Sequence, residues 1–163
     1  MITQTFPNIE IMKGATRELA RQSHIEFIEY TWQKKAEFII GKHTTVICNR
    51  IDKAIEDYKK GISSWIVLKV PVRHGKSDIV SRYLPPHFLG EFPDGEIIVS
   101  GYGQTLVNGF SKFSRSLVRS DKYKRIYPDA KISHENASVE NWGLESSQGS
   151  TCWTGMVDDS SET

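Results

Sequence analysis

The chain has 163 residues, a formal net charge of +1 and 38% apolar residues. This length and composition indicate one soluble globular domain and exclude a series of several domains. The balanced charge excludes a protein that binds nucleic acid through an overall basic surface.

Two helices are predicted in the first 60 residues. Residues 14–30 have apolar side chains at helical spacing, and we expect this helix to cap the domain or to bind a partner. Residues 44–60 carry a second apolar face, and Gly61 follows as a typical C-terminal residue of a helix. We expect this second face to pack on a sheet. The apolar residues of the two helices are Leu19, Ile25, Phe27 and Ile28, then Ile47, Ile51, Ala54, Ile55 and Tyr58.

A strand, a loop and a helix are predicted next. The apolar run at residues 65–68 is typical of a buried strand. A helix is expected over residues 78–84, and Pro85 and Pro86 should end it. The loop between them reads Lys69-Val70-Pro71-Val72-Arg73-His74-Gly75-Lys76-Ser77. Phosphate-binding loops occur between a strand and a helix in this order.

The Gly-Lys-Ser sequence at the start of this helix indicates phosphate binding. Backbone N–H groups at a helix N-terminus bind anions at the positive end of the helix dipole. Gly75 lets a ligand approach the backbone, Lys76 can reach the β- and γ-phosphates, and Ser77 can ligate Mg²⁺. Arg73 adds a permanent positive charge. Because the full pattern has Gly where this chain has Val70, a chance Gly-Lys-Ser at a helix start stays an alternative.

A second strand and a third helix continue the predicted α/β unit. Asp94 and Gly95 predict a turn into a strand at residues 96–100. The helix that follows should bury Leu106, Phe110, Phe113 and Leu117. Alternating strands and helices predict parallel pairing with right-handed crossovers.

The loop and its surroundings resemble the motor domain of large terminase subunits, the DNA-packaging ATPases of tailed phages and prophages. In that family the loop commonly reads Pro-Pro-Arg-His-Gly-Lys-Ser, so the first Gly is dispensable, and Arg73 and His74 belong to the motif. The resemblance covers most of the chain from about Ile25 onward. Its other parts are Trp32, His43, Ser81-Arg82, Leu89-Gly90, Pro93-Asp94, Ser100-Gly101-Tyr102, Phe113-Ser114-Arg115, Tyr123 to Pro128, and Thr154-Gly155.

This resemblance implies a fold, cofactors and partners. The fold is α/β, a P-loop NTPase-like parallel sheet flanked by helices, with a helical segment at 1–42 and a partial ATPase core at 43–163. The cofactors are ATP and Mg²⁺, and Trp32 lies beside the adenine pocket or is a core aromatic residue. The partners are double-stranded DNA, the small terminase subunit and the portal or procapsid, in a homo-oligomeric motor. The nucleotide-binding residues are Trp32, Arg73, His74, Gly75, Lys76 and Ser77.

Other polar residues give weaker indications. A basic cluster is either a DNA-contacting face or an ordinary solvated helix face, and its members are Lys112, Arg115, Arg119, Lys122, Lys124 and Arg125. Three histidines, at positions 43, 74 and 134, lie far apart in the sequence, which disfavours a metal site. No apolar stretch is long enough for a membrane helix and no signal-peptide pattern is present, so we expect the bacterial cytoplasm.

Asp158 and Asp159 are the candidate acidic motif of the ATPase. One acid would hold the Mg²⁺ shell, and the other would orient water. In terminases an Ile/Leu-rich strand separates a Thr-Gly pair from these acids, whereas here only Met156 and Val157 do so. We therefore expect a sheet that is incomplete at its C-terminal end, and exposed terminal aspartates are the alternative. No nuclease domain is expected within these residues.

Two functions fit these observations. The first is an ATP-binding motor domain that couples hydrolysis to DNA translocation when complete, with Ser77 and Asp158 as metal ligands. The second is a truncated, non-catalytic terminase derivative that acts as an interaction module or is a prophage remnant. The isolated chain is expected to hydrolyse ATP poorly in either case. The candidate catalytic residues are Arg73, Lys76, Asp158 and Asp159.

Overall fold

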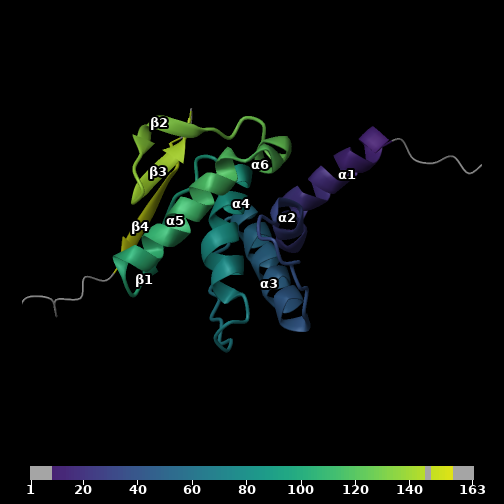
Figure 1. Cartoon of the computed structure of the whole chain (residues 1–163), viewed down its shortest axis with the longest axis horizontal. Helices are drawn as coiled ribbons and strands as arrows, with labels where there is room; N and C mark the ends of the chain where they lie inside the picture. Colours follow the sequence, from purple (N-terminus) through teal and green to yellow (C-terminus); the bar gives the residue numbers. More distant parts are fainter. Residues whose placement is uncertain (1–8, 146–147, 156–163) are drawn as a thin grey trace, which may run out of the picture.

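The structure is a computed structural model, and it describes residues 9–145 and 148–155 of the chain. These residues form an α/β arrangement in which a mixed four-stranded sheet lies beside a group of helices (Figure 1). Helix α5 (Gln104–Arg119) lies between the two parts, since it contacts β1, β2 and β4 on one side and η1, α4 and α6 on the other. The predicted α/β class is therefore confirmed.

The sheet has the strand order β1-β4-β3-β2. Strand β1 (Ile97–Gly101) pairs in parallel with β4 (Ser150–Gly155). Strand β3 (Asn141–Leu144) pairs antiparallel with both β4 and β2 (Ile132–Ala137). The strand predicted at residues 96–100 is confirmed, whereas the prediction of a parallel sheet is wrong, because two of the three strand pairs are antiparallel.

One face of the sheet is packed against α5. Trp142 and Trp153 are buried there with stacked rings, and the Trp142 Nε1–H group donates to the Ser111 hydroxyl oxygen of α5 at 3.0 Å. On the other face, Ile98 of β1 is 77% exposed, and Cys152, its partner on β4, is also exposed. The sheet is thus covered on one face only by the described residues.

The N-terminal part folds as helices α1 (Ile9–Gln22) and α2 (His24–Thr31). The single helix predicted over residues 14–30 is therefore wrong. The break falls at Ser23, whose backbone is extended and whose hydroxyl group contacts Asp52 of α3 (Lys42–Lys59). Asp52 also accepts a hydrogen bond from the His24 N–H group at 2.8 Å, so a tertiary contact starts the second helix.

Helix α3 confirms the helix predicted for residues 44–60, but the expected packing of its apolar face on the sheet is wrong, because α3 packs mainly against α2. Its end is a Schellman motif, in which Gly61 has a φ of 69° and donates its N–H to Tyr58. The Ile62 N–H group donates to the Asp57 carbonyl oxygen at 2.9 Å. This turn sends the chain back along α3 towards the predicted phosphate loop.

The helix after the loop runs through its two prolines. It begins as a π-helix, η1 (Ser77–Tyr83), and continues without a break as α4 (Leu84–Glu91), which contains Pro85 and Pro86. The predicted stop is therefore wrong. A proline lacks an N–H donor and crowds the preceding turn, and the wider π-helical turn just before it accommodates both effects.

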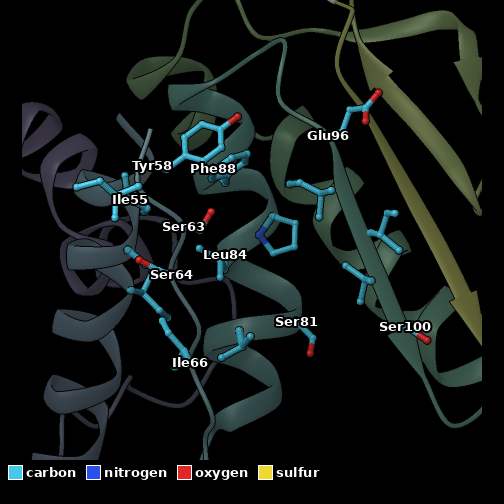
Figure 2. Close-up of a pocket in the computed structure, with 18 of the residues that line it drawn as sticks. Ile55, Tyr58, Ser63, Ser64, Ile66, Ser81, Leu84, Phe88, Glu96 and Ser100 are labelled. Atoms are coloured by element: carbon cyan, nitrogen blue, oxygen red, sulfur yellow. The ribbon is translucent and has the colours of Figure 1, made fainter. Parts of the chain in front are cut away.

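The predicted buried strand at residues 65–68 is also wrong. Residues 62–71 have no regular secondary structure, and Trp65 and Val67 are 96% and 81% exposed. An apolar run becomes a strand only when it can pair with another strand. The strand at the sheet edge on this side is β1, and a cavity separates it from residues 62–66 (Figure 2).

The buried side chains form one core that includes residues of α1, α2 and α3 together with those of α4, α5, α6 (Asp121–Ile126) and the sheet. On α5 the predicted residues Phe110 and Leu117 are buried and Phe113 is half-buried, but Leu106 is 53% exposed. Val107 is buried in its place. None of the helices in the described part of the chain is both long and apolar enough to cross a membrane.

Candidate functional site

The predicted phosphate loop forms a compact turn at the N-terminus of η1. Gly75 has a φ of 77°, and Arg73 has a φ of 66°, which is uncommon for a residue with a side chain. Lys76 already has helical backbone angles, and the Ile79 N–H group donates to the Gly75 carbonyl oxygen at 3.0 Å. Left-handed residues beside helical ones can turn successive N–H groups to one side, which is the arrangement of an anion-binding nest.

A cavity of about 420 Å³ lies at this turn. Lys76 and Ser77 are exposed to solvent, and both line it. The His74 ring is held next to the loop backbone, because its Nδ1 lies 2.9 Å from the Val72 carbonyl oxygen. The structure therefore brings together five of the predicted site residues. The lining residues are Val70, Pro71, Val72, Arg73, His74, Gly75, Lys76, Ser77, Asp78 and Arg82.

Asp78 and Arg82 line this cavity but were not predicted as site residues. The Asp78 carboxylate accepts from Lys34 Nζ at 2.6 Å and from an Arg82 guanidinium nitrogen at 2.5 Å. The Arg82 guanidinium also lies over the ring of Phe110, at 5.4 Å, and its Nε is buried without a hydrogen-bond partner among the described residues. The spacing of four residues between the acid and the base in a predicted helix was the available signal.

Trp32 lies beside η1 and does not line the loop cavity. Its ring stacks on that of Tyr83 at 5.6 Å, and its Nε1–H group donates to the Ala36 carbonyl oxygen at 2.6 Å. Burial raises the pKa of Tyr83 to about 12, so its phenol stays neutral. The placement of Trp32 beside an adenine ring stays a prediction.

His43 and His74 lie closer together than their sequence positions suggest. Their ring centroids are 5.6 Å apart in an edge-to-face arrangement, with His43 at the start of α3. Across the described residues, no group of three or more His, Cys, Asp or Glu side chains could hold a metal ion. The pair is therefore a part of the loop surroundings that sequence spacing did not reveal.

The predicted acids Asp158 and Asp159 lie outside the described residues. Thr154 and Gly155, which precede them, form the end of β4 opposite Ser100 and Gly101 of β1. The Gly155 N–H group donates to the Gln104 side-chain oxygen at 2.7 Å, which ties this strand end to α5.

The basic residues predicted as a DNA-contacting face lie on α5 and α6. All except Arg115, which is half-buried, are exposed. Burial and the nearby Arg119 lower the pKa of Arg115. Lys122 donates to the Trp32 carbonyl oxygen at 3.1 Å, so one member of this group bridges α6 and the segment after α2.

A buried pair of histidines that sequence analysis missed lies under the loop helix. The Nδ1 atoms of His24 and His87 are 2.9 Å apart, and both rings are almost fully buried. The outer nitrogens contact carbonyl oxygens, that of Ile79 at 2.9 Å for His24 and that of Arg21 at 3.1 Å for His87. This pair connects α2, η1 and α4, and only the tertiary fold brings its members together.

Searches against protein-family models, curated proteins and solved structures find no match to this chain.

Proposed function

We propose that the loop at residues 70–77 binds the phosphates of ATP together with Mg²⁺, and that the chain acts as the ATP-binding motor domain of a DNA-packaging terminase. The observation that carries this proposal is the left-handed conformation of Arg73 and Gly75 immediately before a helix that begins with Lys76 and Ser77. A strained conformation at a residue with a side chain is retained where the surrounding structure requires it, and such residues cluster at ligand-binding sites.

Each loop residue has a distinct role in this proposal. Backbone N–H groups at the turn contact phosphate oxygens, and Gly75 keeps the backbone accessible. Lys76 supplies a point charge for the β- and γ-phosphates, and Ser77 supplies a hydroxyl ligand for Mg²⁺. Arg73 is exposed and lines the same cavity, so its charge is available to the terminal phosphate. The loop can perform these binding roles without an acidic motif.

The test is titration calorimetry of the chain with ATP and Mg²⁺. The Lys76→Ala variant should lose about 2 kcal/mol of binding free energy, because it removes a charge-assisted contact to phosphate. Lys69→Ala is the matched control, because Lys69 is also an exposed lysine near the loop but does not line the cavity. Equal affinities for the wild type and Lys76→Ala would rule out the site, as would an equal loss in the control.

A non-catalytic terminase derivative is the second candidate function. It is favoured by the exposure of residues 65 and 67, which leaves the segment leading into the loop unsupported by a strand on either side. Such a chain would bind nucleotide weakly or use its exposed apolar segment for interaction with a partner. The calorimetric test with ATP and Mg²⁺ also bears on this second function. An absence of nucleotide binding would favour it over the ATP-binding motor domain.

A further inference from the structure

The positive charge of the chain is concentrated on α5 and α6. These two helices and the residue between them carry six basic residues and one acidic residue, Asp121, so residues 104–126 have a formal charge of +5. The whole chain has a formal charge of +1, and α5 itself contains no acidic residue. The rest of the chain is therefore net negative, and the excess of positive charge belongs to this segment.

The basic residues of α5 lie on an exposed stripe of this helix. Its members follow one another at intervals of three or four residues, so they share one face of the helix. They are Thr105, Gly109, Lys112, Ser116 and Arg119. Lys112 and Arg119 are two turns apart, which is about 10 Å along the helix axis. Because the other members of the stripe are small, a rigid ligand can approach both cations at once.

These cations are not neutralised by other described residues. Lys112 and Arg119 form no ion pair within the described part of the chain, whereas on α3 Lys53 pairs with Asp57 at 3.2 Å. Arg115 lies between the two cations in sequence, and its pKa is lowered by burial and by the nearby Arg119. The second of these effects is repulsion between like charges, which disfavours the folded helix. A surface that keeps like charges together in this way is complementary to an anionic partner.

The side chains of α5 distinguish among anionic partners. Apart from Leu106 in the first turn, its apolar residues are buried or half-buried, so its exposed stripe has nothing to insert into a lipid layer. The stripe also has no aromatic ring on which an unpaired base could stack. A nucleic-acid duplex needs neither feature, because its phosphates lie outside the paired bases and supply about one charge per 1.7 Å of helix axis. Contacts to these phosphates carry no sequence information.

We propose that the exposed stripe of α5, through Lys112 and Arg119, binds the phosphate backbone of double-stranded DNA without sequence preference. Helix α6 follows at the end of α5 (Figure 1), and its exposed Lys124 and Arg125 add positive charge there. None of these four residues lines the cavity at the phosphate loop, so the surface is separate from the nucleotide site. The choice of DNA over RNA rests on the proposed function, whereas the duplex form rests on the side chains of α5.

The test uses the whole chain and a short fluorescein-labelled DNA duplex, and binding is measured by anisotropy at several salt concentrations. Each phosphate contact contributes about −0.9 to the slope of log affinity against log salt concentration. The double variant Lys112→Ala and Arg119→Ala should therefore make this slope less steep by about 2, for every duplex sequence. The matched control, Arg50→Ala with Lys60→Ala, removes the same charge from exposed positions of α3 and its C-cap and should leave the slope unchanged.

Competition identifies the partner. Single-stranded DNA, an RNA duplex, vesicles of anionic lipid and poly-glutamate should each displace the labelled duplex less well than unlabelled duplex DNA does. The proposal is overturned by an absence of duplex binding at low salt, by an equal change of slope in the control, or by stronger competition from any of the four. Calorimetry of the double variant with ATP and Mg²⁺ should show unchanged nucleotide affinity. A chain that binds nucleotide but no duplex would refute this proposal alone, and one that binds the duplex but no nucleotide would refute the proposed nucleotide site alone.

Discussion

Among single residues, Gly90 shows how closely the helical part is packed. A Cβ atom at this position of α4 would overlap the ring of Tyr127. That ring is fixed, because its hydroxyl group donates to Glu91 at 3.2 Å and the Arg21 guanidinium lies 5.5 Å from its centroid. The position therefore tolerates no side chain without movement of Tyr127.

We predict that Gly90→Ala lowers the free energy of unfolding by about 1–3 kcal/mol, the usual cost of overpacking. Gly109→Ala is the matched control on helix α5, because a Cβ there would meet no atom within 4 Å. That control should raise the free energy of unfolding by about 0.5–1 kcal/mol, since alanine is the better helix former. Urea unfolding monitored by circular dichroism measures both, and equal effects of the two substitutions would contradict the packing at Gly90.

Between elements, the histidine pair makes stability depend on pH. Burial first, and then the neighbouring His87, lower the pKa of His24 to about 3, and burial lowers that of His87 to about 4. Both values lie below the ordinary histidine value of about 6.5, so the unfolded chain binds more protons than the folded chain. The stabilising contribution of the pair is complete above about pH 6.5 and decreases as the pH falls towards 4.

We therefore predict that the wild type loses stability between pH 7 and pH 5, and that replacing both histidines, as in the double variant His24→Gln and His87→Gln, reduces this dependence. His134→Gln is the control, because His134 is exposed. Thermal unfolding at several pH values is the measurement. The pair makes three contacts, one between the two rings and two with backbone carbonyl oxygens, but two neutral imidazoles supply only two N–H groups for them. A stability that rises on acidification would therefore mean that the two rings share an extra proton, contrary to the prediction.

The elements differ in how far the sequence determines them. Helix α3 and strand β1 could be predicted because local periodicity, a glycine stop and a turn signal all agree with the fold. The apolar run at 65–68 has the same local signal as a strand, but pairing depends on a neighbour that no local pattern specifies. The helix through Pro85 and Pro86 depends on a π-helical turn, which proline rules do not anticipate.

The candidate site also has parts that the sequence predicts and parts that it does not. The helix start at Gly75, Lys76 and Ser77 could be predicted from adjacent residues, because it is a feature of local backbone geometry, and phosphate binding by this loop stays a prediction. The contacts of Asp78 with Lys34 and of His43 with His74 join residues that are distant in the sequence, and no periodic pattern indicates them. The cavity between β1 and residues 61–66 could not be predicted either, because it depends on how the tertiary fold places segments that are distant in the sequence.

At the scale of the whole molecule, hydrolysis of ATP would require a carboxylate that orients water in addition to the phosphate loop. Asp78 is the carboxylate that lines the loop cavity, and both of its oxygens are already engaged by Lys34 and Arg82. It is therefore not available to orient a water molecule for attack on the γ-phosphate. In the proposed function, ground-state binding of ATP through Lys76 and Ser77 would not by itself accelerate hydrolysis.

We predict that the chain alone releases phosphate from ATP at the rate of the Lys76→Ala blank, and that DNA does not increase this rate. A steady-state phosphate-release assay at saturating ATP is the measurement. Turnover of about 1 per second or faster would contradict the prediction. If that turnover were lost both in Lys76→Ala and on changing Asp158 and Asp159 to Ala, the two acids would be a working catalytic pair.

The exposure of Trp65 gives the molecule a natural optical reporter. The chain has four tryptophans, of which Trp142 and Trp153 are buried, Trp32 is half-buried and Trp65 is 96% exposed. Indole emission moves to longer wavelength in water, so Trp65 should dominate the red edge of the spectrum. Its neighbour Ile66 lines the cavity between β1 and residues 61–66, and any ligand bound there would change the polarity around the Trp65 ring. The intrinsic emission of the unlabelled protein can therefore follow events at the sheet edge.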